Sequence, residues 1–202
     1  EPLVKAYGLS LARPKASVVI PLYRVYDFLR VQVAAFAGDP WFSEHAELIY
    51  VLDSPEHEAE VAHLIGGLHL AYGLPMQLVA MRRNGGFSAA CNAGAAAAHG
   101  EVLALVNSDV IPAGGGWLEG LIARLDRRAR VGAVGPKLLY DDGSLQHAGL
   151  FFKPAQMLSI GKSTKNPQAA AKVINFLLNS KEGVDILGLE RGVPLSKAAV
   201  TY

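Results

Sequence analysis

Several apolar runs of the chain end in polar residues whose side chains could bind a ligand. These sets are Pro21-Leu22-Tyr23-Arg24, Asp53-Ser54 and Asn107-Ser108-Asp109. The carboxylate of Asp109 is a hard oxygen ligand of the kind that Mg²⁺ or Mn²⁺ takes, sharing its other positions with phosphates and water. An isolated Asn-Ser-Asp triplet more often ends a strand and bonds a turn amide. The triplet alone leaves a metal site and a strand terminus as open alternatives.

A further polar rim is predicted at the loop from Arg82 to Phe87, which contains the pair Gly85-Gly86. A glycine turn before a helix can cradle a phosphate, but it is also ordinary topology. Neither the dinucleotide-binding fingerprint nor the Walker pattern is present in this loop. We therefore expect no nucleoside triphosphate hydrolysis here.

The elements that must position these residues follow an alternating pattern. Short apolar runs typical of buried strands occur at 16–21, 47–52, 77–80 and 102–106. Segments of helical spacing follow them, at 27–38 with Asp27 as cap, at 58–70, at 87–99 closed by Gly100, and at 117–128. This alternation predicts an α/β fold with a mostly parallel sheet flanked by helices. Ligands bind outside the carboxyl ends of strands in such sheets, where the polar sets are found.

The chain is expected to change character near residue 153, after two further elements of the first part. A further strand is predicted at 131–135, and a hairpin of 137–140 with 150–152 around the Asp142-Gly143 turn. Residues 153–202 hold seven Lys or Arg and three Asp or Glu, against twelve and fifteen in residues 1–152. We therefore expect a domain at 1–152 and a tail at 153–202, with a linker at 161–167 and an amphipathic helix from Pro167.

The composition is that of a soluble globular protein. The chain has 202 residues, 51% hydrophobic and 18% charged, with a formal net charge of +1. This charge gives no reason to expect nucleic acid, and the basic cluster from Arg124 to Arg130 most simply forms the solvated end of a helix. Cys91 is the only cysteine, and we expect a buried spectator thiol. The chain has no apolar run of the ~18 residues that a membrane span needs and begins at Glu1 without a signal peptide, so it is interpreted as a soluble excised piece.

The order of the polar sets resembles that of family 2 glycosyltransferases. The matching blocks are Ser17 to Pro21, Val51 to Ser54, Arg83 to Gly94 and Gly100 to Val110. Two later blocks, Val134 to Lys137 and Gln146 to Gly149, are similar to the rhamnosyltransferase-like branch. The resemblance covers residues 16–152, about two thirds of the chain.

This resemblance implies a GT-A-like (Rossmann-like) fold that binds a nucleotide-diphosphate sugar. The residues implied to bind the donor are Pro21, Tyr23, Asp53, Arg83, Asn84, Asn107 and Asp109. Pro21 and Tyr23 would border the nucleotide, Asp53 would bond the base, and Arg83 and Asn84 would line the same pocket. Asp109 would carry the Mg²⁺ or Mn²⁺ ion and the diphosphate. Asn107 stands where many relatives have the first aspartate of an Asp-x-Asp motif, and its amide can still bond a ribose or a phosphate.

The implied reaction transfers the sugar to an acceptor hydroxyl, on a glycan or a lipid-linked molecule, in the cytoplasm or at the inner face of the membrane. A general base must deprotonate this acceptor. In the family, the base carboxylate lies in an acidic segment that has no counterpart after Gly149, and His147 is more simply a packing residue. Three functions stay open: a glycosyltransferase or its donor-binding fragment, a non-catalytic nucleotide- or sugar-binding module, and a structural or regulatory α/β domain.

The tail resembles a different family. Residues of about 156–200, including Ile174 to Leu178 and Gly192-Val193-Pro194, are similar to the carboxyl-terminal region of sugar-binding proteins of ABC transporters. This second resemblance implies a composite chain. Because the tail is small, we expect its amphipathic helix to pack against the sheet or another subunit and not to form an independent domain.

Overall fold

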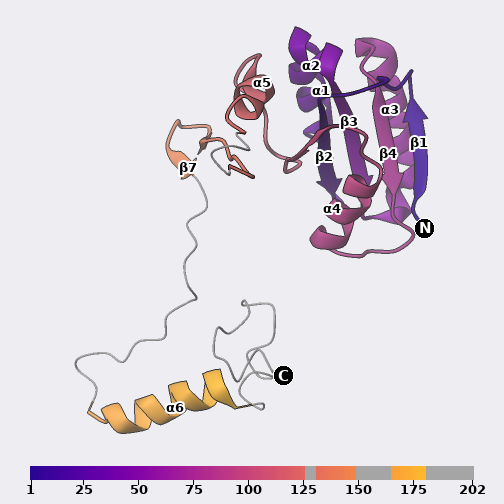
Figure 1. Cartoon of the computed structure of the whole chain (residues 1–202). Coiled ribbons are helices and arrows are strands. Elements are labelled where there is room, and N and C mark those ends of the chain that lie inside the picture. Colours follow the sequence, from indigo (N-terminus) through magenta and orange to yellow (C-terminus); the bar gives the residue numbers. More distant parts are fainter. Residues whose placement is uncertain (126–130, 149–164, 181–202) are drawn as a thin grey trace. The chain divides into compact units, whose positions relative to one another are not determined.

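The computed structural model describes residues 1–125, 131–148 and 165–180 (Figure 1). Contacts within the chain divide it into two compact units, Glu1–Pro136 and Lys137–Tyr202. The boundary expected between residues 152 and 153 falls outside the described residues and stays a prediction.

A five-stranded sheet forms the centre of the first unit (Figure 1). Its strands are β1 (Leu3–Tyr7), β2 (Ala16–Leu22), β3 (Ala46–Leu52), β4 (Met76–Ala80) and β5 (Val102–Leu105). They lie in the order β1-β4-β3-β2-β5, in which β2 to β5 run parallel and β1 pairs antiparallel with β4. The predicted α/β fold with a mostly parallel sheet is therefore confirmed.

Strand burial follows position in this sheet. All seven residues of β3 are buried, because β3 has strands on both sides and helices on both faces. The edge strand β1 alternates half-buried and exposed residues, a weaker pattern that the sequence reasoning did not detect.

Strand β5 was expected to be buried, and this expectation is wrong. Leu103 and Leu105 are 48% and 59% exposed, because among the described residues β5 pairs only with β2.

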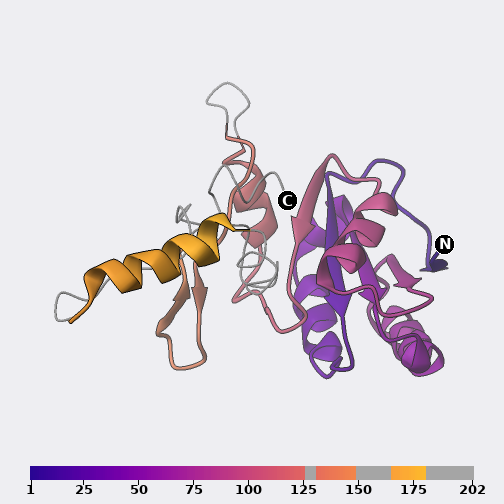
Figure 2. The same ribbon diagram turned by 90° about the horizontal axis from the view of Figure 1, so that it is seen from below.

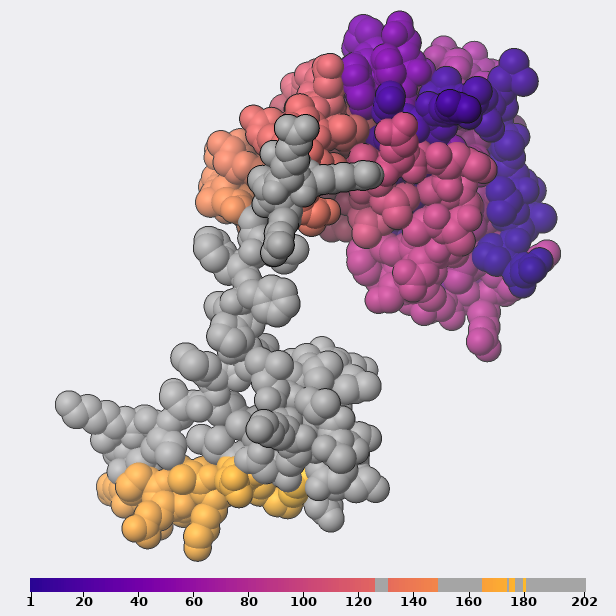
Figure 3. Space-filling view, in the orientation of Figure 1, coloured from indigo at the N-terminus to yellow at the C-terminus, as the bar shows by residue number. Residues whose placement is uncertain are grey.

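The sheet carries helices on both faces. The helices of the first unit are α1 (Leu29–Ala37), α2 (Pro40–His45), α3 (Glu58–Tyr72), α4 (Phe87–Ala96) and α5 (Trp117–Ile122), with a 3₁₀ turn η1 (Pro55–His57) before α3. Apolar residues of α1 and α3 pack on one face of the sheet, and α4 packs on the other (Figure 2). The space-filling view shows α4 and the segments next to it covering the visible face of the sheet, with β1 at its edge (Figure 3).

Close packing of α4 on the sheet depends on Gly94. A Cβ atom added there would collide with the side chains of Val19 and Val51. The helix can approach β2 and β3 at this point only because glycine has no side chain. Cys91, on the same helix, is buried and free, as expected, and burial raises the pKa of its thiol.

Three predicted helix ends differ from the structure. Helix α1 has Phe28 as its N-cap and no side-chain cap, so Asp27 does not cap it. Helix α4 ends at Ala96, and Gly100 is not its C-cap. Gly100 instead lies against the backbone of β2, where a Cβ atom would come within 2.5 Å of Ala16 C and Ser17 N. Helix α5 ends at Ile122, earlier than predicted, and residues 126–130 lie outside the described part of the chain.

The second unit contains a short hairpin, β6 (Leu138–Leu139) with β7 (Leu145–His147). Its turn is closed by hydrogen bonds from Tyr140 N to Ser144 O at 2.9 Å and from Gly143 N to Tyr140 O at 3.0 Å. Hydrogen bonding by the Ser144 side chain, and then by its backbone N, lowers the pKa of the Asp142 carboxyl group and confirms the predicted turn chemistry. Strand β7 comes earlier than the second strand of the predicted hairpin, because this tight turn reverses the chain within five residues. Residues 150–152, where that strand was predicted, lie outside the described part.

Two other predictions for this region have different outcomes. The strand expected at 131–135 is wrong, because these residues form no ladder and stay half-buried or exposed. The helix expected from Pro167 is confirmed as α6 (Pro167–Asn179), whose N-cap Asn166 accepts a hydrogen bond from Ala169 N at 3.0 Å. Within the described ranges, every helix is too short or too polar to cross a membrane.

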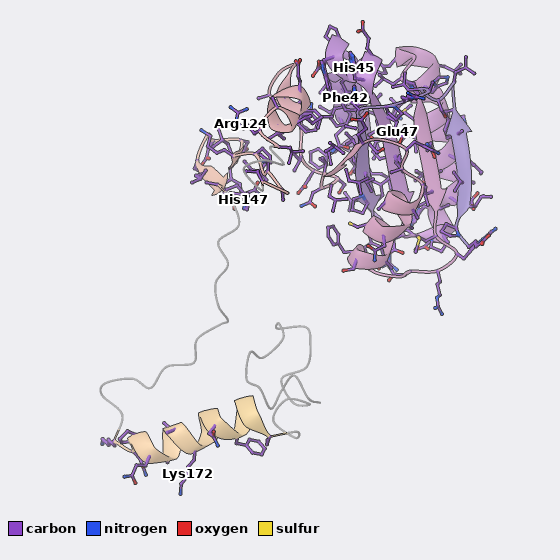
Figure 4. All side chains as sticks on the ribbon, in the orientation of Figure 1. Phe42, His45, Glu47, Arg124, His147 and Lys172 are labelled. Carbon is purple, nitrogen blue, oxygen red and sulfur yellow. The ribbon has the colours of Figure 1, made fainter. Side chains whose placement is uncertain are left out.

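A buried polar cluster joins the amino ends of the strands. Glu47, only 3% exposed, accepts hydrogen bonds from Ser17 Oγ at 2.5 Å, His99 N at 2.6 Å and Gln77 Nε2 at 3.1 Å. Its Oε2 also lies 3.3 Å from His99 Nδ1 (Glu47 is labelled in Figure 4). Ser17 in turn accepts a bond from Gly100 N at 2.8 Å. This cluster ties three strands to the segment that connects α4 with β5.

Candidate functional site

The carboxyl ends of four parallel strands meet at the opposite edge of the sheet. Leu22 at the end of β2 pairs with Leu52 of β3, and Leu52 pairs with Ala80 of β4. Val106, just after β5, donates to Val19 O of β2 at 3.0 Å. The loops that follow these strands therefore start side by side, and they contain the residues predicted to bind the donor.

Asp53 fastens the glycine loop to the end of β3. Its side chain is buried, and its two oxygens accept hydrogen bonds from Gly85 N at 2.7 Å and Gly86 N at 2.8 Å. Asn84 Nδ2 donates to the Asp53 carbonyl at 3.2 Å, which adds a third link. Each carboxylate oxygen keeps a further lone pair, so the predicted bond to a base stays a prediction. Sequence reasoning missed this anchoring role, because the partners lie more than 30 residues away in the chain.

A tight turn after β2 presents Tyr23. Val25 N donates to Tyr23 O at 2.6 Å, and Arg24 between them has a positive φ of 59°, which together define a strained γ-turn. Arg24 N donates to Ser54 Oγ at 2.8 Å, and Ser54 is completely buried. Tyr23 is left 51% exposed, with the Arg24 guanidinium carbon 5.1 Å from its ring centre. Pro21 is half-buried within β2.

Asn107 to Val110 form a turn after β5, closed by Val110 N donating to Asn107 O at 3.2 Å. A backbone hydrogen bond closes this turn, and the Asp109 side chain accepts no bond from a turn amide. The side chains of Asn107 and Asp109 are exposed, and neither makes a hydrogen bond or an ion pair with the described residues. Both therefore present unused oxygen atoms at the carboxyl edge.

Two side chains that sequence reasoning missed hold this part of the chain, and one of them, Gln32, contacts the turn itself. Gln32 of α1 donates from Nε2 to Asn107 O at 3.2 Å and to Val110 O at 2.9 Å. Asp39, the N-cap of α2, accepts a bond from Gly116 N at 2.8 Å. Gln32 is fully buried, whereas a glutamine in an amphipathic helix would ordinarily be placed on the solvent side. Only its long-range contacts reveal its position.

The donor set fits a divalent cation that is shared with a ligand. No group of three or more His, Cys, Asp or Glu among the described residues could hold a metal alone. One exposed carboxylate with a neighbouring amide oxygen supplies hard oxygen ligands, and Mg²⁺ commonly takes one or two carboxylates together with substrate phosphates. Arg83, exposed in the glycine loop, makes no hydrogen bond or ion pair with the described residues and can meet a phosphate.

Two hollows of about 410 and 280 Å³ lie elsewhere, between α1 and α3. Arg30, His63 and Leu64 line both of them. None of the residues predicted to bind the donor lines either hollow. The candidate site is the strand-end edge, because the residues with ligand-binding chemistry lie there.

Comparison with known proteins assigns this α/β chain to a family. The family described as glycosyl transferase family 2 matches residues 17–180. The chain belongs to this family.

Individual relatives are much longer than the chain. An uncharacterized protein, y4gI, of Sinorhizobium fredii is 36% identical over 139 residues, which are 68% of this chain and 15% of that protein. The O-antigen biosynthesis protein RfbC of Myxococcus xanthus is 30% identical over 142 residues, 68% of this chain and 10% of that protein. A mannosyltransferase of Pyrobaculum calidifontis, solved with GDP-Man and Mn²⁺, has 18% identity and a TM-score of 0.49, over 56% of this chain and 32% of that one.

The family match extends into the tail. It continues to residue 180, past the boundary expected at residue 152, so 153–180 are matched by the same family as the strands. These comparisons lend no support to the resemblance to sugar-binding proteins of ABC transporters, or to a composite origin.

Proposed function

We propose that the strand-end edge binds a nucleotide-diphosphate sugar together with Mg²⁺ or Mn²⁺ and transfers the sugar to an acceptor hydroxyl. One observation supports this most strongly: the Asp109 carboxylate is exposed and unpaired on a turn that buried groups hold in place. The turn also lies within the residues matched by glycosyl transferase family 2 and directly after a strand of the parallel sheet, where such sheets bind ligands.

Each predicted residue has a role that its position supports. Pro21 and Tyr23 border the nucleotide, with the Tyr23 ring exposed for stacking. Asp53 and Asn84 shape the glycine loop and offer polar atoms to the base, while Arg83 meets the phosphates. Asn107 bonds the ribose or a phosphate, and Asp109 ligates the metal.

The bound metal would act as a Lewis acid toward the departing diphosphate. The chain's own contribution at this step is to hold the Asp109 carboxylate and the exposed Arg83 guanidinium at one edge. Such preorganised charges stabilise charge that develops on a leaving group. The acceptor is a hydroxyl of a glycan or a lipid-linked molecule in polysaccharide biosynthesis, in keeping with the name of the M. xanthus relative and with the rhamnosyltransferase-like blocks.

A second candidate is a module that binds a nucleotide sugar without transferring it. The triplet Asn107-Ser108-Asp109 has a single carboxylate, and no general base is identified among the described residues. Turnover of a nucleotide sugar with any glycan or lipid-linked hydroxyl would rule this candidate out. Donor binding without turnover across an acceptor series would favour it.

Nucleotide binding is tested by thermal unfolding of the chain with UDP, GDP, ADP, CDP or dTDP, each with Mn²⁺. A diphosphate present at 100 times its Kd should stabilise the protein by about 2.7 kcal/mol. Asp109→Ala should remove most of this stabilisation, because it deletes the carboxylate proposed to ligate the metal while leaving the exposed turn intact.

The matched control is Glu44→Ala, since Glu44 is also exposed and unpaired among the described residues but precedes β3 at the amino end of the sheet. It should leave the ligand-induced shift unchanged. A full shift in Asp109→Ala would sink the metal role. No shift of the unaltered protein with any of the five nucleotides would sink donor binding altogether.

A further inference from the structure

Gln32 is a buried polar residue in a helix that otherwise packs apolar side chains on the sheet. It is 0% exposed, while the preceding Val31 is 50% exposed. Its neighbour Val33 and the nearby Leu29 belong to the core under α1. Burying a glutamine amide at this position costs free energy unless the amide makes hydrogen bonds.

The Gln32 amide has one possible orientation. Nε2 faces the carbonyl oxygens of Asn107 and Val110, at 3.2 and 2.9 Å. Turning the amide over would place Oε1 against these two oxygens and lose both bonds, so the network assigns the orientation. Oε1 itself is buried and has no partner among the described residues. The buried Gln32 amide therefore makes two donor bonds and leaves its acceptor unused among the described residues.

These two bonds bracket Asp109. The Asp109 side chain has no partner among the described residues, so the backbone of its turn, which sets the direction of its Cα–Cβ bond, is what places the carboxylate at the edge. Gln32 holds the carbonyl oxygens at both ends of that turn, and Asp39 fixes the chain again at Gly116. A ligand group held within about 0.5 Å of its productive position binds a metal far better than a mobile one.

We propose that Gln32 is a positioning residue for divalent-cation binding at Asp109. This inference rests on the proposed function, because it concerns the same metal and nucleoside diphosphate. Gln32 does not touch the ligands; it acts by clamping the Asn107–Val110 turn from α1. A purely structural glutamine would affect stability but not the affinity for the cation.

The chain offers a matched control for that distinction. Gln77 of β4 is also buried, at 7% exposure, and its Nε2 donates to Glu47 at the amino ends of the strands. Replacing either glutamine by methionine removes a buried amide at nearly constant volume. Only Gln32→Met also releases the turn that carries Asp109.

The test measures the affinity for Mn²⁺ in the 202-residue chain, from the electron paramagnetic resonance signal of free Mn²⁺, at a saturating concentration of the diphosphate that the unaltered protein binds best. Gln32→Met should weaken Mn²⁺ binding roughly tenfold or more, the range seen when groups that orient metal ligands are removed. Gln77→Met should stay within about twofold of the unaltered protein, since its bond lies at the far end of the sheet.

If Gln32→Met does not unfold cooperatively, Gln32→Asn is measured instead. It keeps an amide but is one methylene shorter, so it cannot keep both bonds and should also weaken Mn²⁺ binding. Unchanged affinity in a folded Gln32 variant, or equal weakening by Gln77→Met, overturns the positioning role alone. Failure of the unaltered protein to bind Mn²⁺ with any of the five diphosphates instead overturns the proposed function, and the role of Gln32 with it.

Discussion

Two buried carboxylates, Asp53 and Glu47, lie at opposite ends of β3 and both organise backbone. Asp53 accepts the amides of Gly85 and Gly86 and so shapes the candidate donor site. Glu47 accepts Ser17, Gln77 and His99 at the end far from that site. Because a buried carboxylate is costly unless its lone pairs are used, each brings several donors to one point. The same residue type thus serves binding at one end and stability at the other.

At the residue scale, Glu47→Ala should lower the free energy of unfolding by about 3 kcal/mol or more, because it leaves buried donors of Ser17 and Gln77 without a partner. The measurement is urea unfolding. Glu101→Ala is the control: Glu101 forms an exposed ion pair with Lys15 at 3.5 Å and should cost less than about 1 kcal/mol. Similar losses in the two variants would contradict the role given to the buried cluster.

At the scale of elements, the helices differ in how closely they approach the sheet. Helix α4 lies against β2 and β3 at Gly94, where a Cβ atom has no room. This close approach brings the amino end of α4 and the Gly85-Gly86 loop toward Asp53. Helix α1 contributes through Gln32, whose bonds reach the turn after β5. Two helices on opposite faces of the sheet therefore shape the same edge.

Gly94→Ala should destabilise the protein by about 1–3 kcal/mol, because overpacking against Val19 and Val51 outweighs the better helix propensity of alanine. Gly67→Ala in α3 is the matched control, since nothing lies within 4 Å of the Cβ position there. That change should stabilise the protein by up to about 1 kcal/mol. Thermal and urea unfolding of both variants check the opposite signs, and stabilisation by Gly94→Ala would contradict the packing argument.

At the scale of the whole molecule, the chain corresponds to a small part of its relatives, 15% of one and 10% of the other. The described edge contains donor-binding candidates from four strands but no identified base. A complete transferase needs both. Donor binding and sugar transfer are consequently separate properties of this chain and are tested separately.

Removal of divalent metal should abolish most nucleotide binding. With EDTA in place of Mn²⁺, the diphosphate-induced rise in melting temperature should largely disappear, because Asp109 and the phosphates would repel one another without the cation. Excess Mg²⁺ or Mn²⁺ should restore the rise. An equal rise in EDTA would mean that the nucleotide binds without metal, through groups such as the Arg83 guanidinium.

The sequence by itself determined the α/β class, the positions of β2, β3, β4 and α6, and the family. These follow from local apolar runs, helical periodicity and short blocks of residues, which need no knowledge of distant contacts. The triplet Asn107-Ser108-Asp109 was found in the same way, from its place directly after an apolar run.

Only the tertiary structure decided the features that depend on partners far apart in the chain. Strand β1 pairs with β4 between residues that are 69 to 77 positions apart, and β5 is exposed because no described strand covers its outer side. Gln32 contacts Asn107 and Val110, 75 and 78 residues away, and Asp53 binds a loop 32 and 33 residues away. Hydrogen bonds of this kind leave no periodic signal in the sequence, because they depend on how strands and helices come together in space.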